Sequence, residues 1–361
     1  MDKIIGLGNA LVDVLATLKD DTILDEMGLP KGSMQLIDDA KLQQINEKFS
    51  NMKTLLATGG SAGNTILGLS CLGAATGFIG KVGNDNYGNF FRENLQKNNI
   101  EDNLLLSDLP SGVASTFISS DGERTFGTYL GAASTLRAED LSLDMFKGYA
   151  YLYIEGYLVQ DHDMILRAIK LAKEAGLQIC LDMASYNIVE EDKEFFSLLI
   201  SKYVDIVFAN EEEAKAFTGK EPEEALEIIG KLCSIAIVKI GCRGSLIRKG
   251  TEEVRVSAIP VKKVIDTTGA GDYFAAGFLY GTSGRGFFRI FRNFFRRADV
   301  RSGIFCDLPD DIYCDGSFFS GKCRHSSSGA GKTDPVHEST DAVLFCSCSM
   351  GRSCSSLRCL V

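Results

Sequence analysis

The chain has 361 residues, of which 45% are hydrophobic, and a formal net charge of −10. This length supports one large globular domain with additions, or two ordinary domains. The acidic balance and the lack of a basic stripe in the first 280 residues argue against a protein that binds nucleic acid regardless of sequence.

No apolar run approaches the roughly 20 residues that a bilayer span needs, so no membrane span is expected. The chain begins with a strand-like run and has no signal-peptide core, which predicts a cytoplasmic protein. Cys71, Cys180, Cys233 and Cys242 lie in apolar or strand-like surroundings and are predicted to be buried thiols.

Short β-type runs alternate with helical patterns up to about residue 240. This alternation predicts a mainly parallel sheet wrapped by helices, with ligands at the carboxyl ends of the strands. The runs, in chain order, span residues 4–7, 63–72, 76–79, 87–98, 149–154, 164–175, 178–182, 205–209, 211–217 and 235–240. Polar or glycine positions close to predicted strand ends are Gly59, Gly60, Asp85, Asp182, Asn210, Gly241 and the segment 269–272.

Two segments, 14–38 and 112–131, do not fit the alternation. They contain β-type pieces, such as 114–119 and 124–129, interrupted by Gly and by Asp-Gly. Such interruptions favour small hairpins over crossovers. We therefore expect the two segments to form a lid over the site.

Residues 282–361 differ from the rest of the chain. They contain 11 Lys and Arg against 8 Asp and Glu, a net charge of +3, and seven of the eleven cysteines. Only residues 287–298 show a helical period, with Phe and Ile on one face and Arg on the other, and we expect this apolar face to dock on the core. The sequence thus predicts a domain over residues 1–281 and an atypical tail, rich in Cys, Ser, Phe and Arg, with the composition of a shifted reading frame or a foreign segment.

Asp13 and the segment 59–64 are candidate ligand contacts in the first part of the chain. Gly59 and Gly60 permit close approach of a ligand, and Asn64, one turn into the next helix, can donate and accept hydrogen bonds to hydroxyls. Asp13 could accept two sugar hydroxyls, although a lone Asp after a strand is more often a turn residue.

Asn210 and Glu213 have two interpretations. An Asn at the N-cap with Glu three residues later forms a capping box, which needs no ligand. Polar groups at a strand end could also hold a hydrated Mg²⁺ ion, which keeps several of its waters. The two interpretations are compatible.

The segment 266–272, with the sequence DTTGAGD, carries the strongest chemical signal. A β-rich run, 254–265, precedes it and a helical pattern of small apolar residues follows it. Glycines at such a strand-to-helix junction let an anion approach the unpaired N–H groups and positive dipole end of the helix. Asp272, beside a phosphate, is expected to take a proton from an attacking hydroxyl; the alternative is that it only caps the helix.

Five motifs occur in a fixed order along the chain: Gly59-Gly60-x-x-x-Asn64, Gly80-x-x-Gly83-x-Asp85, Asn210-x-x-Glu213, Gly241-x-x-Gly244 and Asp266-Thr267-x-Gly269-Ala270-Gly271-Asp272. In these motifs and their order the chain resembles the ribokinase family of sugar and nucleoside kinases, also called the PfkB family. The expected fold is α/β, a three-layer α/β/α arrangement with a mostly parallel central sheet and a small β lid. The resemblance implies an ATP-dependent kinase that transfers the γ-phosphate to a hydroxymethyl group of a sugar or nucleoside.

The resemblance also implies roles for individual residues. Asp272 is the expected base, and the expected anion hole is formed by Gly269, Ala270 and Gly271. The expected contacts to the hydroxyls of the acceptor are Asp13, Gly59, Gly60 and Asn64. The expected contacts to ATP are Asn210, Lys239, Gly241, Gly244 and Thr268, with Asn210 and Glu213 organising Mg²⁺ through water. In some family members a monovalent cation assists beside the anion hole, and the matching positions are Asp266 and Thr268.

Residues 121–125, 129–133 and 155–157 look more similar to the adenosine kinase branch of the family than to ribokinase itself. The family pattern ends at Thr282, before the helices that complete the adenine side of the ATP pocket in other members. Two alternatives therefore stay open, a non-catalytic sensor of sugars or nucleosides on the same fold and a kinase inactivated by its tail. The expected partner is a small-molecule acceptor, and a homodimer is left open.

Overall fold

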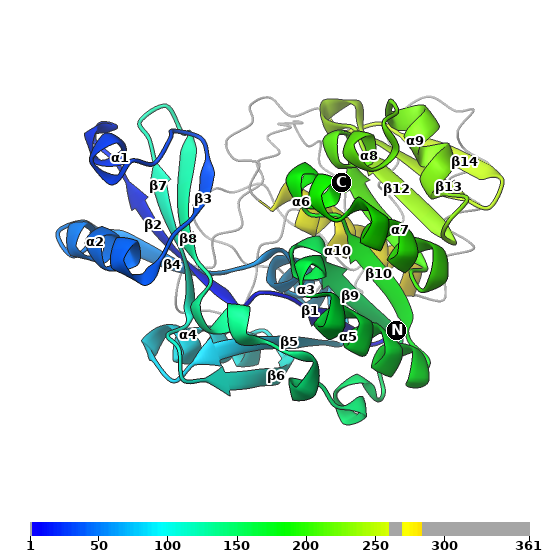
Figure 1. Ribbon diagram of the computed structural model, residues 1–361, viewed down its shortest axis with the longest axis horizontal. Coiled ribbons are helices and arrows are strands. Elements are labelled where there is room, and N and C mark those ends of the chain that lie inside the picture. Colours follow the sequence, from blue (N-terminus) through cyan, green and yellow to red (C-terminus); the bar gives the residue numbers. More distant parts are fainter. Residues whose placement is uncertain (1, 260–268, 284–361) are drawn as a thin grey trace, which may run out of the picture.

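The computed structural model describes residues 2–259 and 269–283, which form a large sheet, a smaller sheet and the helices around them (Figure 1). The large sheet has nine strands in the order β14-β13-β12-β11-β10-β9-β1-β5-β6. Their bounds are β1 (Ile4–Leu7), β5 (Thr76–Gly83), β6 (Ile100–Ser107), β9 (Tyr151–Glu155), β10 (Gln178–Asp182), β11 (Ile206–Asn210), β12 (Ile235–Lys239), β13 (Ser245–Lys249) and β14 (Glu252–Val256).

Neighbouring strands of the large sheet pair in parallel from β6 to β12, and β13 and β14 are added at one edge by antiparallel pairing, of β12 with β13 and of β13 with β14. Strands that are buried on both faces explain the continuous apolar runs from which they were predicted. Within the predicted run 254–265, residues 254–256 belong to β14, residues 257–259 form no strand, and residues 260–268 lie outside the described part of the chain.

Helices cover both faces of the large sheet and pack into two separate cores. Alternating side chains of β1 divide between them, because Ile4 belongs to one core whereas Ile5 and Leu7 belong to the other. The helices on the Ile4 face are α3 (Ser61–Cys71), α4 (Asn86–Lys97) and α10 (Ala270–Ser283). Those on the other face are α5 (His162–Glu174), α6 (Tyr186–Glu191), α7 (Lys193–Lys202), α8 (Glu211–Thr218) and α9 (Pro222–Ile229). The predicted three-layer α/β/α fold with a mostly parallel sheet is confirmed.

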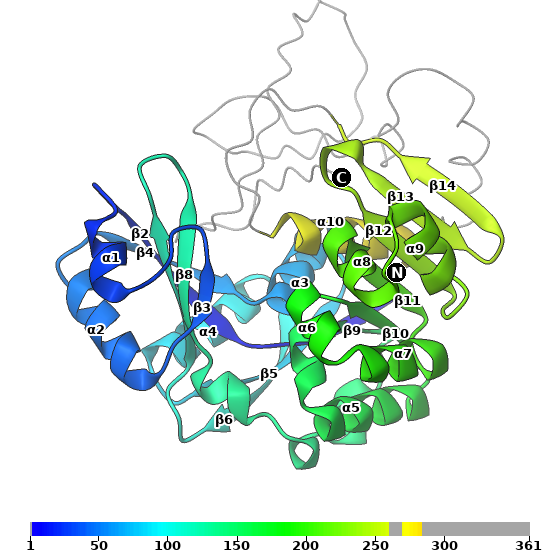
Figure 2. The ribbon, with the colours of Figure 1, turned by 45° about the horizontal axis from the view of Figure 1, so that its top comes forward.

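The smaller sheet, here called the lid, has five strands in the order β3-β8-β7-β2-β4. Their bounds are β2 (Leu11–Thr17), β3 (Met34–Leu36), β4 (Thr54–Gly59), β7 (Gly112–Ile118) and β8 (Arg124–Tyr129), and two helices, α1 (Thr22–Met27) and α2 (Asp39–Phe49), accompany them. Both helices lie on the outer side of the lid, away from the large sheet (Figure 2). They pack on Val14, Ala16, Val113 and Phe117, which all point to one face of the lid.

The structure corrects two expectations about the lid. The pair β7 and β8 is the predicted antiparallel hairpin, but the segment 14–38 is not a hairpin, because β2 pairs in parallel with β7 and β3 in parallel with β8. The intervening α1 gives the chain the length to make this crossing. The lid also extends beyond the two predicted segments, since it begins at Leu11 and includes α2 and β4.

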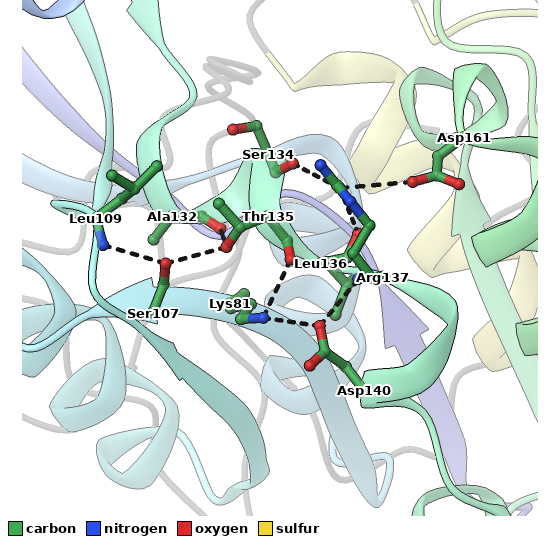
Figure 3. A network of polar contacts seen from close by, with 10 residues as sticks. All are labelled: Lys81, Ser107, Leu109, Ala132, Ser134, Thr135, Leu136, Arg137, Asp140 and Asp161. Carbon is green, nitrogen blue, oxygen red and sulfur yellow. Dashed lines mark hydrogen bonds and ion pairs between the residues drawn. The ribbon is translucent and has the colours of Figure 1, made fainter.

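The chain passes between the large sheet and the lid at four places, after β1, β4, β6 and β8. After β8 it returns through short 3₁₀ turns, η1 (Gly131–Thr135), η2 (Ala138–Asp140) and η3 (Leu143–Phe146). Figure 3 shows how Lys81 of β5 fixes this return, with its Nζ 3.1 Å from the Thr135 carbonyl oxygen and 2.7 Å from Asp140 Oδ2. The Thr135 hydroxyl also donates to Ser107 Oγ of β6 at 3.0 Å.

Two further turns, η4 (Gly156–Gln160) and η5 (Gly241–Arg243), follow the strands β9 and β12. Within the described residues, no helix has the length and apolar character to span a membrane. The four predicted thiols are free, but only Cys180 is buried as expected, whereas Cys71 and Cys233 are half-buried. Cys242 is exposed because it lies in the η5 turn, which contradicts its expected burial. The predicted helix 287–298 and the rest of the tail beyond residue 283 lie outside the described part of the chain.

Replacing Phe117 with Ala should destabilise the lid. Its ring is fully buried and lies 4.9 Å, centroid to centroid, from the ring of Phe49 on α2. Removing such a side chain costs about 3–5 kcal/mol because it leaves a cavity in a packed core. Urea unfolding followed by circular dichroism measures this loss. Leu106→Ala is the control, because the Leu106 side chain is 56% exposed and its removal should change the free energy of unfolding little. Equal unfolding midpoints for the two variants would contradict the packing described here.

Candidate active site

Asp272 lies in the first turn of α10, and two side chains of α3 hold its carboxylate. Ser61 Oγ donates to Asp272 Oδ1 at 2.7 Å, and Asn64 Nδ2 donates to Asp272 Oδ2 at 2.9 Å. The two helices approach closely at Gly68, where an added Cβ would lie 2.9 Å from both Ala276 Cβ and Tyr273 Cδ1. A glycine at this position of α3 therefore permits the contact that brings the three polar side chains together.

The environment of Asp272 changes its acidity. Burial raises the pKa of the Asp272 carboxyl to about 6, an effect that the hydrogen bonds from Asn64 and Ser61 oppose. The nearby charge of Asp182 raises this pKa further, and that of Lys239 lowers it. The carboxylate is thus ionised at neutral pH but close to its titration range.

The predicted anion hole lies beside this carboxylate. Gly269, with a φ of +73°, directly precedes α10, and its carbonyl oxygen accepts the Tyr273 N–H at 2.9 Å. Because α10 begins at Ala270, the N–H groups of its first turn have no acceptor within the helix. Asp266 and Thr268, the positions expected to contact a monovalent cation and ATP, lie outside the described residues.

Lys239, at the end of β12, contributes a buried positive charge close to the start of α10. Its Nζ lies 3.1 Å from Asp182 Oδ2 and 3.1 Å from the position that a Cβ on Gly271 would occupy. Burial opposes the protonation of Lys239, but the carboxylates of Asp182, Glu213 and Asp272 outweigh it and raise the pKa of the lysine. The ammonium group therefore stays charged beneath the backbone of the predicted anion hole.

Asp182 keeps this lysine in place. The side chain is buried at the carboxyl end of β10, and its Oδ1 accepts the Ala184 N–H at 3.0 Å. The Tyr153 hydroxyl, from the neighbouring strand β9, lies 3.4 Å from Asp182 Oδ2. The sequence marked Asp182 as a strand-end residue without giving it a role.

Asn210 and Glu213 form the predicted capping box at the start of α8. Asn210 Oδ1 accepts the Glu213 N–H at 2.8 Å, and Glu213 Oε2 accepts the Asn210 N–H at 2.7 Å. Glu213 Oε1 also accepts a bond from Asn210 Nδ2 at 2.7 Å. Burial and the charge of Asp182 raise the pKa of Glu213 to about 7, although Lys239 opposes this.

Gly241 and Gly244 flank the η5 turn that leads from β12 to β13. A side chain at Gly244, with a φ of +97°, would overlap the Val256 carbonyl oxygen of β14, so the hairpin itself requires a glycine there. Gly241 has more space, since the atom closest to an added Cβ is Glu211 Oε1 at 3.9 Å. The structure thus gives Gly244 a backbone role in addition to its predicted contact with ATP.

Asp13 lies inside β2 rather than in a turn, and it faces the site from the lid. In residues 2–259 and 269–283, no group donates a hydrogen bond to its carboxylate. Burial raises the pKa of Asp13 to about 7; the charge of Arg124 opposes this rise, and that of Asp272 adds to it. Gly59 on β4 leaves the space that the Asp13 carboxylate occupies, because an added Cβ would overlap it.

The face of the lid that carries Asp13 combines apolar side chains with a few polar ones, namely Thr116, Thr128 and Arg124. The register aligns Asp13 with Ala114 of β7, Ala114 with Thr128 of β8, and Thr128 with Leu36 of β3, so all four side chains point to one face. Exposed apolar side chains on this face are Met34 (48%), Leu36 (66%) and Leu55 (60%). This face is opposite the one covered by α1 and α2.

Glu155 supports the site from behind and was not predicted as a site residue. Its Oε1 accepts bonds from the Asn9 N–H at 2.9 Å and from Asn9 Nδ2 at 2.6 Å, and its Oε2 accepts the Ala62 N–H at 2.9 Å. It thereby fixes the first crossing and the start of α3 together. Burial raises the pKa of Glu155 to about 7 against these hydrogen bonds. The position of Glu155 at the end of β9 was the signal from which a site residue could have been predicted. Ser61 was also not predicted, although it lies within the predicted motif 59–64.

The chain is similar to known proteins in both sequence and structure. The family described as pfkB family carbohydrate kinase matches residues 34–285. The chain is 29% identical over 221 residues to an uncharacterised sugar kinase of Archaeoglobus fulgidus, covering 60% of this chain and 86% of that protein. It is 25% identical over 256 residues to ribokinase of Mus musculus, covering 67% and 76%. The crystal structure of an adenosine kinase from Sinorhizobium meliloti matches with a TM-score of 0.70 and 36% identity, covering 79% of this chain and 88% of that one.

Replacing Ser61 with Ala should raise the pKa of Asp272 above about 6, because the Ser61 hydroxyl stabilises the ionised form. Carbon-detected NMR titration of the aspartate carboxyl groups measures the shift. Ser70→Ala is the matched control, since Ser70 is on the same helix but its hydroxyl contacts the Asn98 carbonyl oxygen. An unchanged Asp272 titration in Ser61→Ala would show that this hydrogen bond does not form in solution.

Proposed function

The chain belongs to the pfkB family of carbohydrate kinases. From this premise we propose that Asp272 is the catalytic base, which activates the hydroxymethyl group of a nucleoside or sugar toward the γ-phosphate of ATP. The observation that supports this role most directly is the position of its carboxylate. It is held by two hydrogen bonds at the start of α10, beside backbone N–H groups and the Lys239 ammonium.

A base in this position has a limited task. Phosphoryl transfer passes through a loose transition state, so the base mainly orients the attacking hydroxyl and receives its proton late. Ser61 and Asn64 fix both oxygens of Asp272 and thereby fix the direction from which the hydroxyl approaches. A pKa of about 6 leaves the carboxylate ionised at neutral pH and able to accept a proton.

The anion hole and Lys239 would stabilise the transferred phosphoryl group. The first-turn N–H groups at Gly269, Ala270 and Gly271 offer hydrogen bonds and the positive end of the α10 dipole. Lys239 adds a full charge 3.1 Å from the Cβ position of Gly271. Together these groups would neutralise negative charge that develops on the phosphate oxygens.

The family acts on ATP, and a magnesium ion near Lys239 would be held mainly through water, because within the described residues no group of three or more His, Cys, Asp or Glu side chains forms a direct metal site. The negative charges of Asp182, Glu213 and Asp272 raise the pKa values of neighbouring groups, and Lys239 is the cation among them. Asn210 and Glu213 would hold Mg²⁺ through water, since the capping box already occupies their direct contacts. Such a Mg²⁺ ion would neutralise negative charge on the ATP phosphates. Gly241 and Gly244 would border the nucleotide.

A nucleoside is the favoured acceptor. Asp13, whose carboxylate has no hydrogen-bond donor among the described residues, would accept the ribose hydroxyls, with Gly59, Gly60 and Asn64 alongside. The apolar side chains of Met34, Leu36 and Leu55 on the same face suit a planar base better than a free sugar, which requires more polar contacts. The match of 36% identity to an adenosine kinase supports the same choice.

Asp272→Asn tests the proposal. ADP release should be measured from the full chain with ATP, Mg²⁺ and a panel that includes adenosine, guanosine, ribose and fructose. We expect release with a nucleoside, and a decrease of about 10²–10⁴-fold in kcat for Asp272→Asn, since the base is lost while its shape is kept. Calorimetry should give unchanged acceptor binding in the variant. Binding without any ADP release from the unaltered chain would favour a non-catalytic sensor, and equal release from both proteins would rule out Asp272 as the base.

The pH dependence should follow two carboxyl groups. Both Asp13 and Asp272 act in their ionised forms, and their pKa values are raised to about 7 and about 6, so kcat/KM for the acceptor should fall below pH 7 and more steeply below pH 6. In Asp13→Asn the upper inflection should disappear and the lower one should persist. Steady-state rates between pH 5 and 9 measure this, and a profile that stays flat down to pH 5 would contradict both assignments.

A further inference from the structure

Asp85 belongs to a sequence motif, Gly80-x-x-Gly83-x-Asp85, to which the proposed chemistry gives no role. It follows β5 and is the N-cap of α4, where its Oδ1 accepts the Gly88 N–H at 2.8 Å. A cap needs only this contact. The Asp85 side chain nevertheless makes further contacts with a distant part of the chain.

Those contacts are with Ser111, at the crossing from β6 into the lid strand β7. Asp85 Oδ2 accepts the Ser111 N–H at 2.7 Å, and Asp85 Oδ1 accepts the Ser111 hydroxyl at 2.7 Å. The oxygen of the same hydroxyl accepts the Gly83 N–H at 2.9 Å. Ser111 is buried, so this crossing is tied to the end of β5 and to the start of α4 at once.

The glycines nearby are required by the closeness of this junction. An added Cβ at Gly83 would lie 2.6 Å from the Leu109 carbonyl oxygen and 2.7 Å from the Ser111 nitrogen. At Gly88 an added Cβ would overlap the Gly83 carbonyl oxygen and lie 2.9 Å from Ser111 Oγ. The contact with the lid crossing therefore explains Gly83 and Asp85 of the motif without a ligand, whereas Gly80 faces Phe78 and the Gly8 carbonyl oxygen.

The same junction also holds the exit from the lid. The Ala132 N–H donates to the Pro110 carbonyl oxygen at 2.7 Å, which joins the residue before Ser111 to the crossing after β8. Gly131, with a φ of +47°, lies against this carbonyl. Both ends of the β7–β8 hairpin are thus fixed at one point, and Lys81 holds the next turn of the exit.

The hairpin in turn sets the surroundings of Asp13. β7 pairs in parallel with β2, with Gly112 aligned with Leu11 and Ala114 aligned with Asp13. Arg124, which lowers the pKa of Asp13 by its charge, is on β8 of the same hairpin. A displaced hairpin would therefore move both the neighbours of the Asp13 carboxylate and the apolar face beside it.

We propose that Asp85, through Ser111, is a positioning residue that fixes the lid hairpin over the acceptor site. This rests on the proposed role of Asp13 in acceptor binding. The acceptor concerned is a nucleoside or sugar hydroxyl group, and ATP, bound at the large sheet, is not affected. Glu155 fixes the other two crossings, so the lid is held at its base by two carboxylates.

The test compares Asp85→Asn, Ser111→Ala and the double variant with Asp205→Asn. Asp205 is a matched control because its carboxylate also accepts a backbone N–H of another element, that of Ile179 at 2.7 Å, and it lies at the amino end of β11, whereas the chain leaves for the lid from the carboxyl ends of β1 and β6. Loss of the junction should raise KM for adenosine about tenfold, equivalent to roughly one charge-assisted hydrogen bond, with KM for ATP unchanged. The double variant should be no worse than Asp85→Asn, since both changes break one contact.

Amide hydrogen exchange gives a readout that does not depend on catalysis. Exchange in residues 112–129 should become faster in Asp85→Asn than in the unaltered chain and stay unchanged in Asp205→Asn. Unchanged exchange in the hairpin, or the same change of KM in the Asp205 control, would overturn the proposal. Failure of the unaltered chain to release ADP would instead count against the proposed catalytic function, and the exchange experiment would still decide the role of Asp85.

Discussion

The close contact between α3 and α10 is the interaction on which the site depends. Gly68 lets the two helices approach, and the approach brings Ser61 and Asn64 within hydrogen-bond distance of Asp272. The Ala62 N–H in the first turn of α3 donates to Glu155. A single buried acid therefore links the end of β9, the first crossing to the lid and the helix that orients the carboxylate of Asp272.

A second feature of the site is a set of buried carboxyl groups whose pKa values are raised. Burial raises the pKa values of Asp13, Glu155 and Glu213 to about 7 and that of Asp272 to about 6. Because these folded-state values exceed the ordinary ones, the four groups make the folded protein less stable as the pH rises from about 4 through 7. Packing elsewhere in the two large cores must offset this cost, which is expected of a site arranged for binding rather than for stability.

Much of the fold could be predicted because its signals are local. Apolar runs with short helical patterns between them identified β1, β5, β10 and α5, and the glycines at 59–60 and 269–271 were correctly placed at element ends. The lid was only partly predicted, because β3 is three exposed residues long and β2 pairs with β7, a hundred residues away. No local pattern reports such pairing.

The geometry of the candidate site was predicted to a similar degree. Strand ends and family motifs pointed to Asp13, Asn64, Lys239 and Asp272. In the structure Asn64 bonds to Asp272, and Asp13 and Lys239 lie close enough to interact with its charge, whereas the catalytic roles of these residues stay a prediction. The roles of Ser61, Glu155 and Asp182 could not be predicted, because each depends on a contact between elements that are far apart in the sequence.

The separate location of Met34, Leu36 and Leu55 on the edge strands β3 and β4 has an evolutionary consequence. These side chains face solvent and contribute little to the cores, whereas the residues around Asp272 are constrained by helix contacts. Mutations on the edge strands can therefore accumulate with little effect on folding or on the contacts around Asp272. Under the proposed function, this would let acceptor preference diverge while the residues around Asp272 are retained, which fits a family whose members carry names as different as ribokinase and adenosine kinase.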